Sequence, residues 1–288
     1  STDSPGRTHT LQLTWAASQG IVIEGRYNYS YGAILSNNVG LLALSNSSIP
    51  ITLPYANERD RVPTLTGNGF TGLTSFGPYD NFSDKHTYTG SVSWTRGGHT
   101  MKFGAVHSMY RKNENALAGN NEGIFNVFGT TVASGVANTT LNQNIQRWAN
   151  FLAGNVGANG FTQARFAYTA DLRQKAIEAY AQDEWRVLRN LTLSAGVRYS
   201  FFGAPWDRNG RLTNFVPERF DATQAPMITG LGARVAGTGN NCNGIIANSQ
   251  NFDSGPVSFN CRPTVSPFGK FVFDAKKNNF APRVGLAW

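Results

Sequence analysis

The chain has 288 residues, which fits one large all-β domain or two domains of ordinary size. Only 15% of the residues are charged, and the 31 glycines and 19 phenylalanines favour strands and turns over helices. The formal net charge is +8, but the basic residues are spread along the chain, so we expect no nucleic-acid-binding surface. No stretch approaches the ~18 consecutive apolar residues of a spanning helix. A chain of this kind would cross a membrane only as a closed β-barrel.

Apolar and polar residues alternate in segments of about ten residues, a pattern typical of strands with one apolar and one polar face. These segments lie at 10–15, 21–31, 87–94, 101–109, 177–187, 191–201 and 280–288, with a weaker one at 161–168. Short turns at 17–20, 96–99 and 188–190 join them into hairpins, whereas long segments at about 32–84, 112–172 and 203–279 separate the hairpins. Short periplasmic turns and long extracellular loops are typical of outer-membrane barrels. The sequence therefore predicts an all-β fold, part of an antiparallel transmembrane β-barrel.

The apolar parity of each strand, meaning every second residue, ends in aromatic residues. Aromatic rings favour the two interfaces of a membrane, where the ring is buried and its polar edge stays wet. We predict that the residues near the short turns and near the long loops lie at these interfaces: Trp15, Trp94, Trp185 and Trp288 at one, and Tyr29, Tyr31, Tyr199 and Phe201 at the other. The apolar parity between them is predicted to face lipid, through Ile21, Ile23, Tyr27, Leu193, Val197 and Tyr199. Asp183 falls on the same parity, close to a turn, where a carboxylate costs little.

The polar parity is predicted to face the lumen of the barrel. The candidate lumen-lining residues are Gln182, Glu184, Arg186, Arg198 and Ser200. The four histidines (His9, His86, His99, His107) share no metal-ligand spacing, and no catalytic partners are identifiable for Glu114, Glu122 and Glu178. The G-x-G-x-x-G pattern at 67–72 lies inside a long loop, not between a strand and a helix. We therefore expect no catalytic, cofactor or metal site, and no enzyme.

Two further features lie in the long segments. Cys242 and Cys261 share one Gly/Asn-rich stretch, so we predict that they form a loop disulfide if the chain is exported. In the second long segment, Ile145, Trp148, Ala149 and Leu152 have helical spacing and Gly154 follows as a stop signal. We expect a loop helix whose apolar stripe packs on the rim of the barrel.

Several strings resemble the Oar-like branch of the TonB-dependent receptors. They are Arg26–Gly32, Phe76–Asp80, Tyr180–Trp185, Leu191–Leu193 with Gly196–Tyr199, Asn209–Phe215 and Asn278–Gly285. Their order and spacing, over nearly the whole chain, carry the resemblance. It implies a barrel of about 22 strands in the outer membrane of a Gram-negative bacterium, surrounded by lipid, which takes up a substrate that the sequence does not identify.

Members of that branch usually also have a regulatory-like N-terminal domain, a plug and a TonB box. We find none of these in 1–288 and expect one barrel segment, whose contact with the TonB complex depends on parts of the protein outside it. No export signal is visible at Ser1–Gly6, so we expect that it has been removed or lies outside this sequence. Two other classes stay open. One is an outer-membrane protein of adhesion or secretion, and the other is a soluble β-sandwich that binds a ligand.

Overall fold

The computed structural model describes residues 2–48, 51–66, 72–73, 77–115, 121–125, 128–156, 160–165, 167–230, 232, 235–248 and 263–288. They form two compact units. The first consists of Ser1–Ser4, Ala33–Asn81 and Glu114–Ala170, and the second of Pro5–Gly32, Phe82–Asn113 and Asp171–Trp288. No helix of the described residues is long and apolar enough to cross a membrane.

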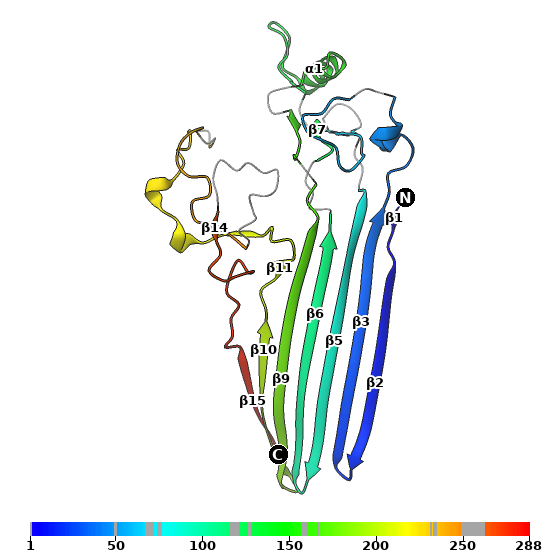
Figure 1. Ribbon diagram of the computed structural model, residues 1–288, viewed down its shortest axis with the longest axis vertical. Coiled ribbons are helices and arrows are strands. Elements are labelled where there is room, and N and C mark those ends of the chain that lie inside the picture. The colour runs from blue at the N-terminus through cyan, green and yellow to red at the C-terminus, as the bar shows by residue number, and fades with distance from the viewer. Residues whose placement is uncertain are drawn as a thin grey trace. The chain divides into compact units, whose positions relative to one another are not determined.

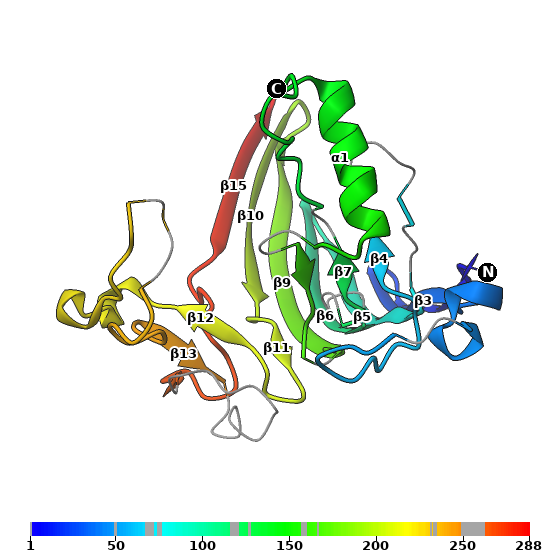
Figure 2. The same cartoon turned by 90° about the horizontal axis from the view of Figure 1, so that it is seen from above.

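The largest sheet has nine strands, and its main path runs in the order β1-β3-β5-β6-β9-β10-β15 (Figure 1). The strands are β1 (Thr2–Asp3), β2 (Gly6–Ser18), β3 (Ile21–Ser36), β5 (Tyr79–Arg96), β6 (His99–Glu114), β9 (Ala170–Leu188), β10 (Leu191–Phe202), β11 (Trp206–Asp207) and β15 (Phe280–Ala287). β2 pairs with β3, and β11 pairs with β9. Seen end-on in Figure 2, the strands from β5 to β15 follow a curved line. The described strands do not close into a barrel, since the path ends at β15.

The three predicted hairpins are confirmed. β2 and β3, β5 and β6, and β9 and β10 are antiparallel neighbours joined by short turns. Gly20 and Gly97 have φ angles of 89° and 60°, a region that favours glycine and allows the tight reversal. The strands are longer than the alternation predicts, because β5 has 18 residues and β9 has 19. The first two long loops are therefore shorter than predicted, because each begins later and ends earlier in the chain.

The predicted strand at 161–168 is wrong for most of its length. Among the described residues of this segment, only Phe161–Thr162 is a strand, β8, and it pairs with β7 (Ile124–Phe125) instead of joining the nine-stranded sheet. β7 also pairs in parallel with β4 (Thr64–Leu65). These contacts join the first and second long segments, which local alternation cannot reveal.

The first unit also contains the predicted helix, which is confirmed. α1 (Thr140–Leu152) is capped by Thr139, whose side chain accepts a hydrogen bond from the Asn142 N–H, and it is followed by Gly154 with a φ of 65°. Its apolar stripe is exposed in the structure, with Ile145 at 57% and Leu152 at 78%. Packing of the stripe on a barrel rim stays a prediction. Two short 3₁₀ helices, η1 (Gly40–Leu42) and η2 (Leu44–Asn46), precede it.

The third long segment belongs to the second unit. A small sheet of β12 (Thr213–Phe215), β13 (Ile245–Ala247) and β14 (Thr264–Val265) follows the order β12-β13-β14, and η4 (Pro217–Arg219) and η5 (Ala222–Gln224) lie between β12 and β13. Asp207, 2% exposed, lies near the start of this segment, and its carboxylate accepts the N–H groups of Asp171 and Arg211 at 2.8 and 3.0 Å. Cys242 is disulfide-bonded, whereas Cys261 lies outside the described residues, so the predicted pairing stays a prediction.

Candidate functional site

The strand registers place the two parities on opposite faces of the sheet. Leu193 lies opposite Trp185 on β9 and Leu286 on β15, and Arg198 lies opposite Tyr180 and Ala281. Near the other edge of the sheet, Trp15 of β2 lies opposite Ile23 of β3. Directly opposed residues in antiparallel strands point to the same face. The prediction that the apolar positions share one face, and the polar positions the other, is therefore confirmed for these strand pairs.

All five candidate lumen residues lie on the polar face. Gln182, Glu184 and Arg186 lie opposite Gly196, Ser194 and Thr192, and Arg198 and Ser200 continue the same row of β10. The structure adds a partner that the sequence does not reveal. Arg198 Nε donates to Glu178 Oε2 at 3.0 Å, and Ser200 Oγ lies 3.4 Å from the same oxygen. Glu178 therefore has a partner, Arg198. Its partner follows from the register of β9 against β10, not from spacing along the chain.

A groove of about 600 Å³ runs over this polar face. Its lining includes Lys102, Tyr180, Gln182, Glu184, Arg198 and Arg283. The ring of Tyr180 lies over Gly104 of β6, where an added Cβ would come within 2.5–2.7 Å of the ring atoms. A side chain at 104 would therefore force the Tyr180 ring to move from this position. The groove combines both signs of charge with an aromatic ring, so it can bind polar solutes.

The apolar face is exposed in the structure. Leu11 and Leu13 are 71% and 70% exposed, and Val284 and Leu286 reach 85% and 68%. A β-sandwich would bury this face against a second sheet. The exposed apolar face therefore argues against the sandwich and is what a lipid-facing surface requires.

The interface aromatics lie on the apolar face. Near the short turns, Trp15, Trp94 and Trp185 oppose Ile23, Met101 and Leu193, and Trp288 follows β15 and is 89% exposed. Near the long loops, the rings contact each other in pairs: Tyr29 with His86, Tyr31 with Phe82, and Tyr199 with Phe280, with centroids 5.0, 6.1 and 4.9 Å apart. Phe201 lies opposite Ile177 on the same face.

Asp183, the charged residue on the apolar face, has a partner. Its Oδ2 lies 2.6 Å from His99 Nδ1, and the His99 ring stacks on Trp185 with the two planes 9° apart. The two side chains are 41% and 35% exposed, with His99 the more exposed. An imidazole beside the carboxylate either forms an ion pair with it or donates a hydrogen bond to it. Both interactions lower the free-energy cost of placing Asp183 on this face.

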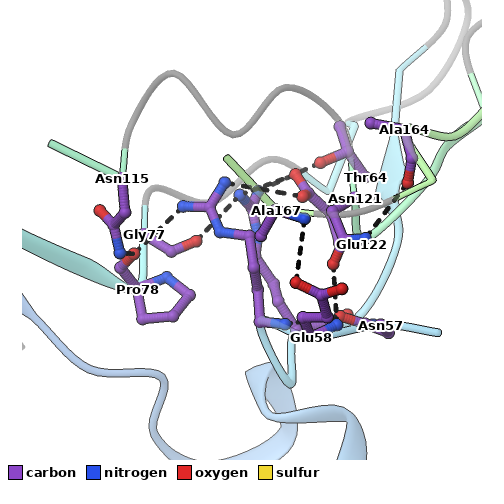
Figure 3. A network of polar contacts seen from close by, with 12 residues as sticks. Asn57, Glu58, Thr64, Gly77, Pro78, Asn115, Asn121, Glu122, Ala164 and Ala167 are labelled. Carbon is purple, nitrogen blue, oxygen red and sulfur yellow. Dashed lines mark hydrogen bonds and ion pairs between the residues drawn. The ribbon is translucent and has the colours of Figure 1, made fainter. Parts of the chain in front are cut away.

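A second polar cluster lies inside the first unit and joins two of the long loops (Figure 3). Glu122 is 4% exposed and accepts from Arg61 Nη1 at 3.1 Å, with Arg59 Nη1 3.8 Å away. Arg61 also donates to the Gly77 carbonyl and to Thr64 Oγ1. Burial lowers the pKa of Arg61, and the Glu122 carboxylate partly opposes this effect.

Asn121 extends this cluster and is fully buried. Its side chain accepts the Glu58 N–H at 2.8 Å and donates to the carbonyls of Ala56 and Ala164 at 3.0 and 3.1 Å. The Glu58 carboxylate in turn accepts the Ala167 N–H. The first and second long loops are thus held by a shared core of hydrogen bonds. Within the described residues, no group of three or more His, Cys, Asp or Glu side chains could hold a metal ion.

A family model described as "Outer membrane beta barrel domain" matches residues 1–288. No curated protein and no solved structure matches the chain.

Proposed function

The chain belongs to the outer membrane β-barrel domain family, and from this premise we propose that it forms part of the wall of a TonB-dependent transporter. Membership of the family places the protein in the outer membrane of a Gram-negative bacterium. The step to transport depends on the two-faced sheet and on the resemblance to TonB-dependent receptors in its strands. In this proposal the apolar face meets lipid, and the polar face lines the path of a substrate that enters when a plug is displaced.

The polar face is the observation that carries the proposal. It presents the Glu178–Arg198 ion pair, the Tyr180 ring and the groove of about 600 Å³ on strands of up to 19 residues. A membrane crossing needs only about ten residues, so such strands continue beyond the lipid. The part of these strands beyond the lipid supports capture of a ligand before transport.

Energy-dependent exposure of the polar face tests this function. We would introduce cysteine at Gln182, on the polar face, and at Ala195, on the apolar face, in the full-length protein. A plug covers the lumen until the TonB complex and the proton-motive force displace it. A membrane-impermeant thiol reagent should therefore label Gln182→Cys faster in energised cells than in cells without TonB, whereas Ala195→Cys should show no such dependence.

The same experiment separates the alternative role in adhesion or secretion. A structural barrel has no step that consumes energy from TonB. If labelling of Gln182→Cys were equal in energised cells and in cells without TonB, transport would be refuted and a structural role favoured.

A further inference from the structure

The apolar face carries a cationic groove at its long-loop end. The groove has a volume of about 870 Å³, and the charged side chains that line it are Arg111, Arg173, Lys175, Arg208 and Asp84. Asp171, next to it, forms an ion pair with Arg173 at 2.9 Å and lies 3.8 Å from Arg111. Four cations thus face two carboxylates, and the groove keeps a net positive charge.

Two of these cations are free to bind a ligand. Lys175 and Arg208 are exposed, and within the part of the chain that the structure describes neither has a carboxylate partner. Both lie on the apolar parity: Arg173 and Trp206 are directly opposed on β9 and β11, Lys175 is two residues after Arg173, and Arg208 is two residues after Trp206. The charges therefore point to the same side as Val197 and Leu193, away from the polar face.

The height of the groove along the strand corresponds to a lipid headgroup region. Lys175 and Arg173 precede Trp185 by ten and twelve residues. At ~3.3 Å per residue and a tilt of ~45°, these separations are about 23 and 28 Å along the membrane normal. The apolar band of an outer-membrane barrel is about 25 Å tall. If Trp185 marks one interface, the two cations lie at the other.

The rest of the lining of the same groove is largely aromatic and apolar. Tyr27, Tyr29, His86 and Met109 line it, and the Tyr27 hydroxyl is 2.8 Å from His86 Nδ1. Trp206, also in the lining, has Lys270 Nζ 3.8 Å above its ring. A ligand that fits would carry negative charge next to apolar or ring surface, which describes an anionic amphiphile.

From this arrangement we propose that the groove binds the phosphorylated headgroup of an outer-leaflet lipid, with Lys175, Arg208 and Arg173 around the phosphate and the acyl chains along the aromatic surface. Arginine and lysine are the side chains that bind phosphate most effectively, and partial removal from water strengthens the contact. The inference rests on the proposed orientation of the two faces, but not on transport. It gives the barrel a fixed lipid contact on its outer surface.

Lipid binding by the full-length protein in detergent tests the proposal. Three probes would be titrated: a bisphosphorylated glycolipid, the same glycolipid without its phosphates, and inorganic phosphate. The protein should prefer the phosphorylated lipid by at least tenfold. Lys175→Gln with Arg208→Gln should weaken binding roughly thirtyfold, since each surface cation contributes about fivefold. Lys175→Arg with Arg208→Lys keeps both charges and should bind as the wild type does.

Lys102→Gln is the matched control, because Lys102 is an exposed cation in the groove of the polar face. It should leave lipid binding unchanged. Equal binding by the wild type and the Lys175/Arg208 double variant would overturn the inference, and so would displacement of the lipid by an equal concentration of inorganic phosphate. Loss of binding in Lys102→Gln, with normal binding in the double variant, would show that the faces are reversed and would also refute the proposed orientation.

Discussion

Replacement of Glu122 by glutamine tests whether the buried cluster holds the two outer loops together. The carboxylate is 4% exposed and is the anionic partner of Arg61 and Arg59, whose side chains are 7% exposed. Glutamine keeps the shape but leaves two buried guanidinium groups without an anion. Removing one partner of a buried ion pair costs about 3–5 kcal/mol. We expect the free energy needed to open the first unit to fall by that amount.

Hydrogen exchange of individual backbone amides measures this opening. The Thr64 and Leu65 N–H groups donate to carbonyls of Gly123 and Leu73 at 3.0 and 2.9 Å, so they report on the first unit. A loss of 3–5 kcal/mol should speed their exchange roughly 150- to 4,000-fold, where exchange follows opening of the unit. The exposed Glu184→Gln variant is the control and should change these amides by less than threefold.

A triple variant distinguishes a lost charge network from a lost contact. Glu122→Leu with Arg61→Met and Arg59→Met removes all three charges, and replacing a buried ion pair or triad by apolar residues of similar size is often neutral. Its exchange should be at least tenfold slower than that of Glu122→Gln. Exchange in Glu122→Gln within threefold of the wild type would refute the reasoning, because the carboxylate would then contribute nothing to the unit.

Three further predictions concern other contacts. His99→Phe should destabilise the barrel by about 1–2 kcal/mol because it leaves Asp183 alone on the apolar face, and adding Asp183→Leu should restore the denaturant midpoint in lipid; an unchanged midpoint in His99→Phe would contradict this. Asp207→Ala should cost about 2 kcal/mol, since two backbone N–H groups lose their acceptor, and proteolysis of the third loop should speed up accordingly; cleavage at the wild-type rate would refute it. The Cys242–Cys261 bond should contribute about 3 kcal/mol by loop closure, and thiol labelling of the denatured, unreduced protein should detect no free cysteine; labelling of both would refute it.

The hairpins and the two faces could be predicted from the sequence because both are local properties. Alternation with a period of two assigns Leu193 and Arg198 to opposite faces, and glycine at 20 and 97 indicates the turns. The ends of the strands were underestimated because alternation weakens where the strand leaves the apolar band. The predicted strand at 161–168 is wrong over most of its described residues because an alternating pattern does not say which partner a segment has.

The polar partners could not be predicted. Glu178 meets Arg198, twenty residues away, only through the register of β9 against β10. Glu122 meets Arg61 across 61 residues of two long loops, where neither period nor spacing carries information. Asp183 and His99 lie 84 residues apart and meet only because their strands are in the same sheet. In each pair the partner is decided by topology and not by nearby sequence.

The orientation of the two faces is the central claim, and quenching of spin labels by a lipid-soluble reagent tests it most directly. Labels would be placed one at a time at Leu193 and Val197, on the apolar face, and at Thr192 and Arg198, on the polar face, in the full-length protein in bilayers. The account predicts that the reagent reaches the labels at Leu193 and Val197 more readily than those at Thr192 and Arg198. Greater access at Thr192 and Arg198 would contradict it.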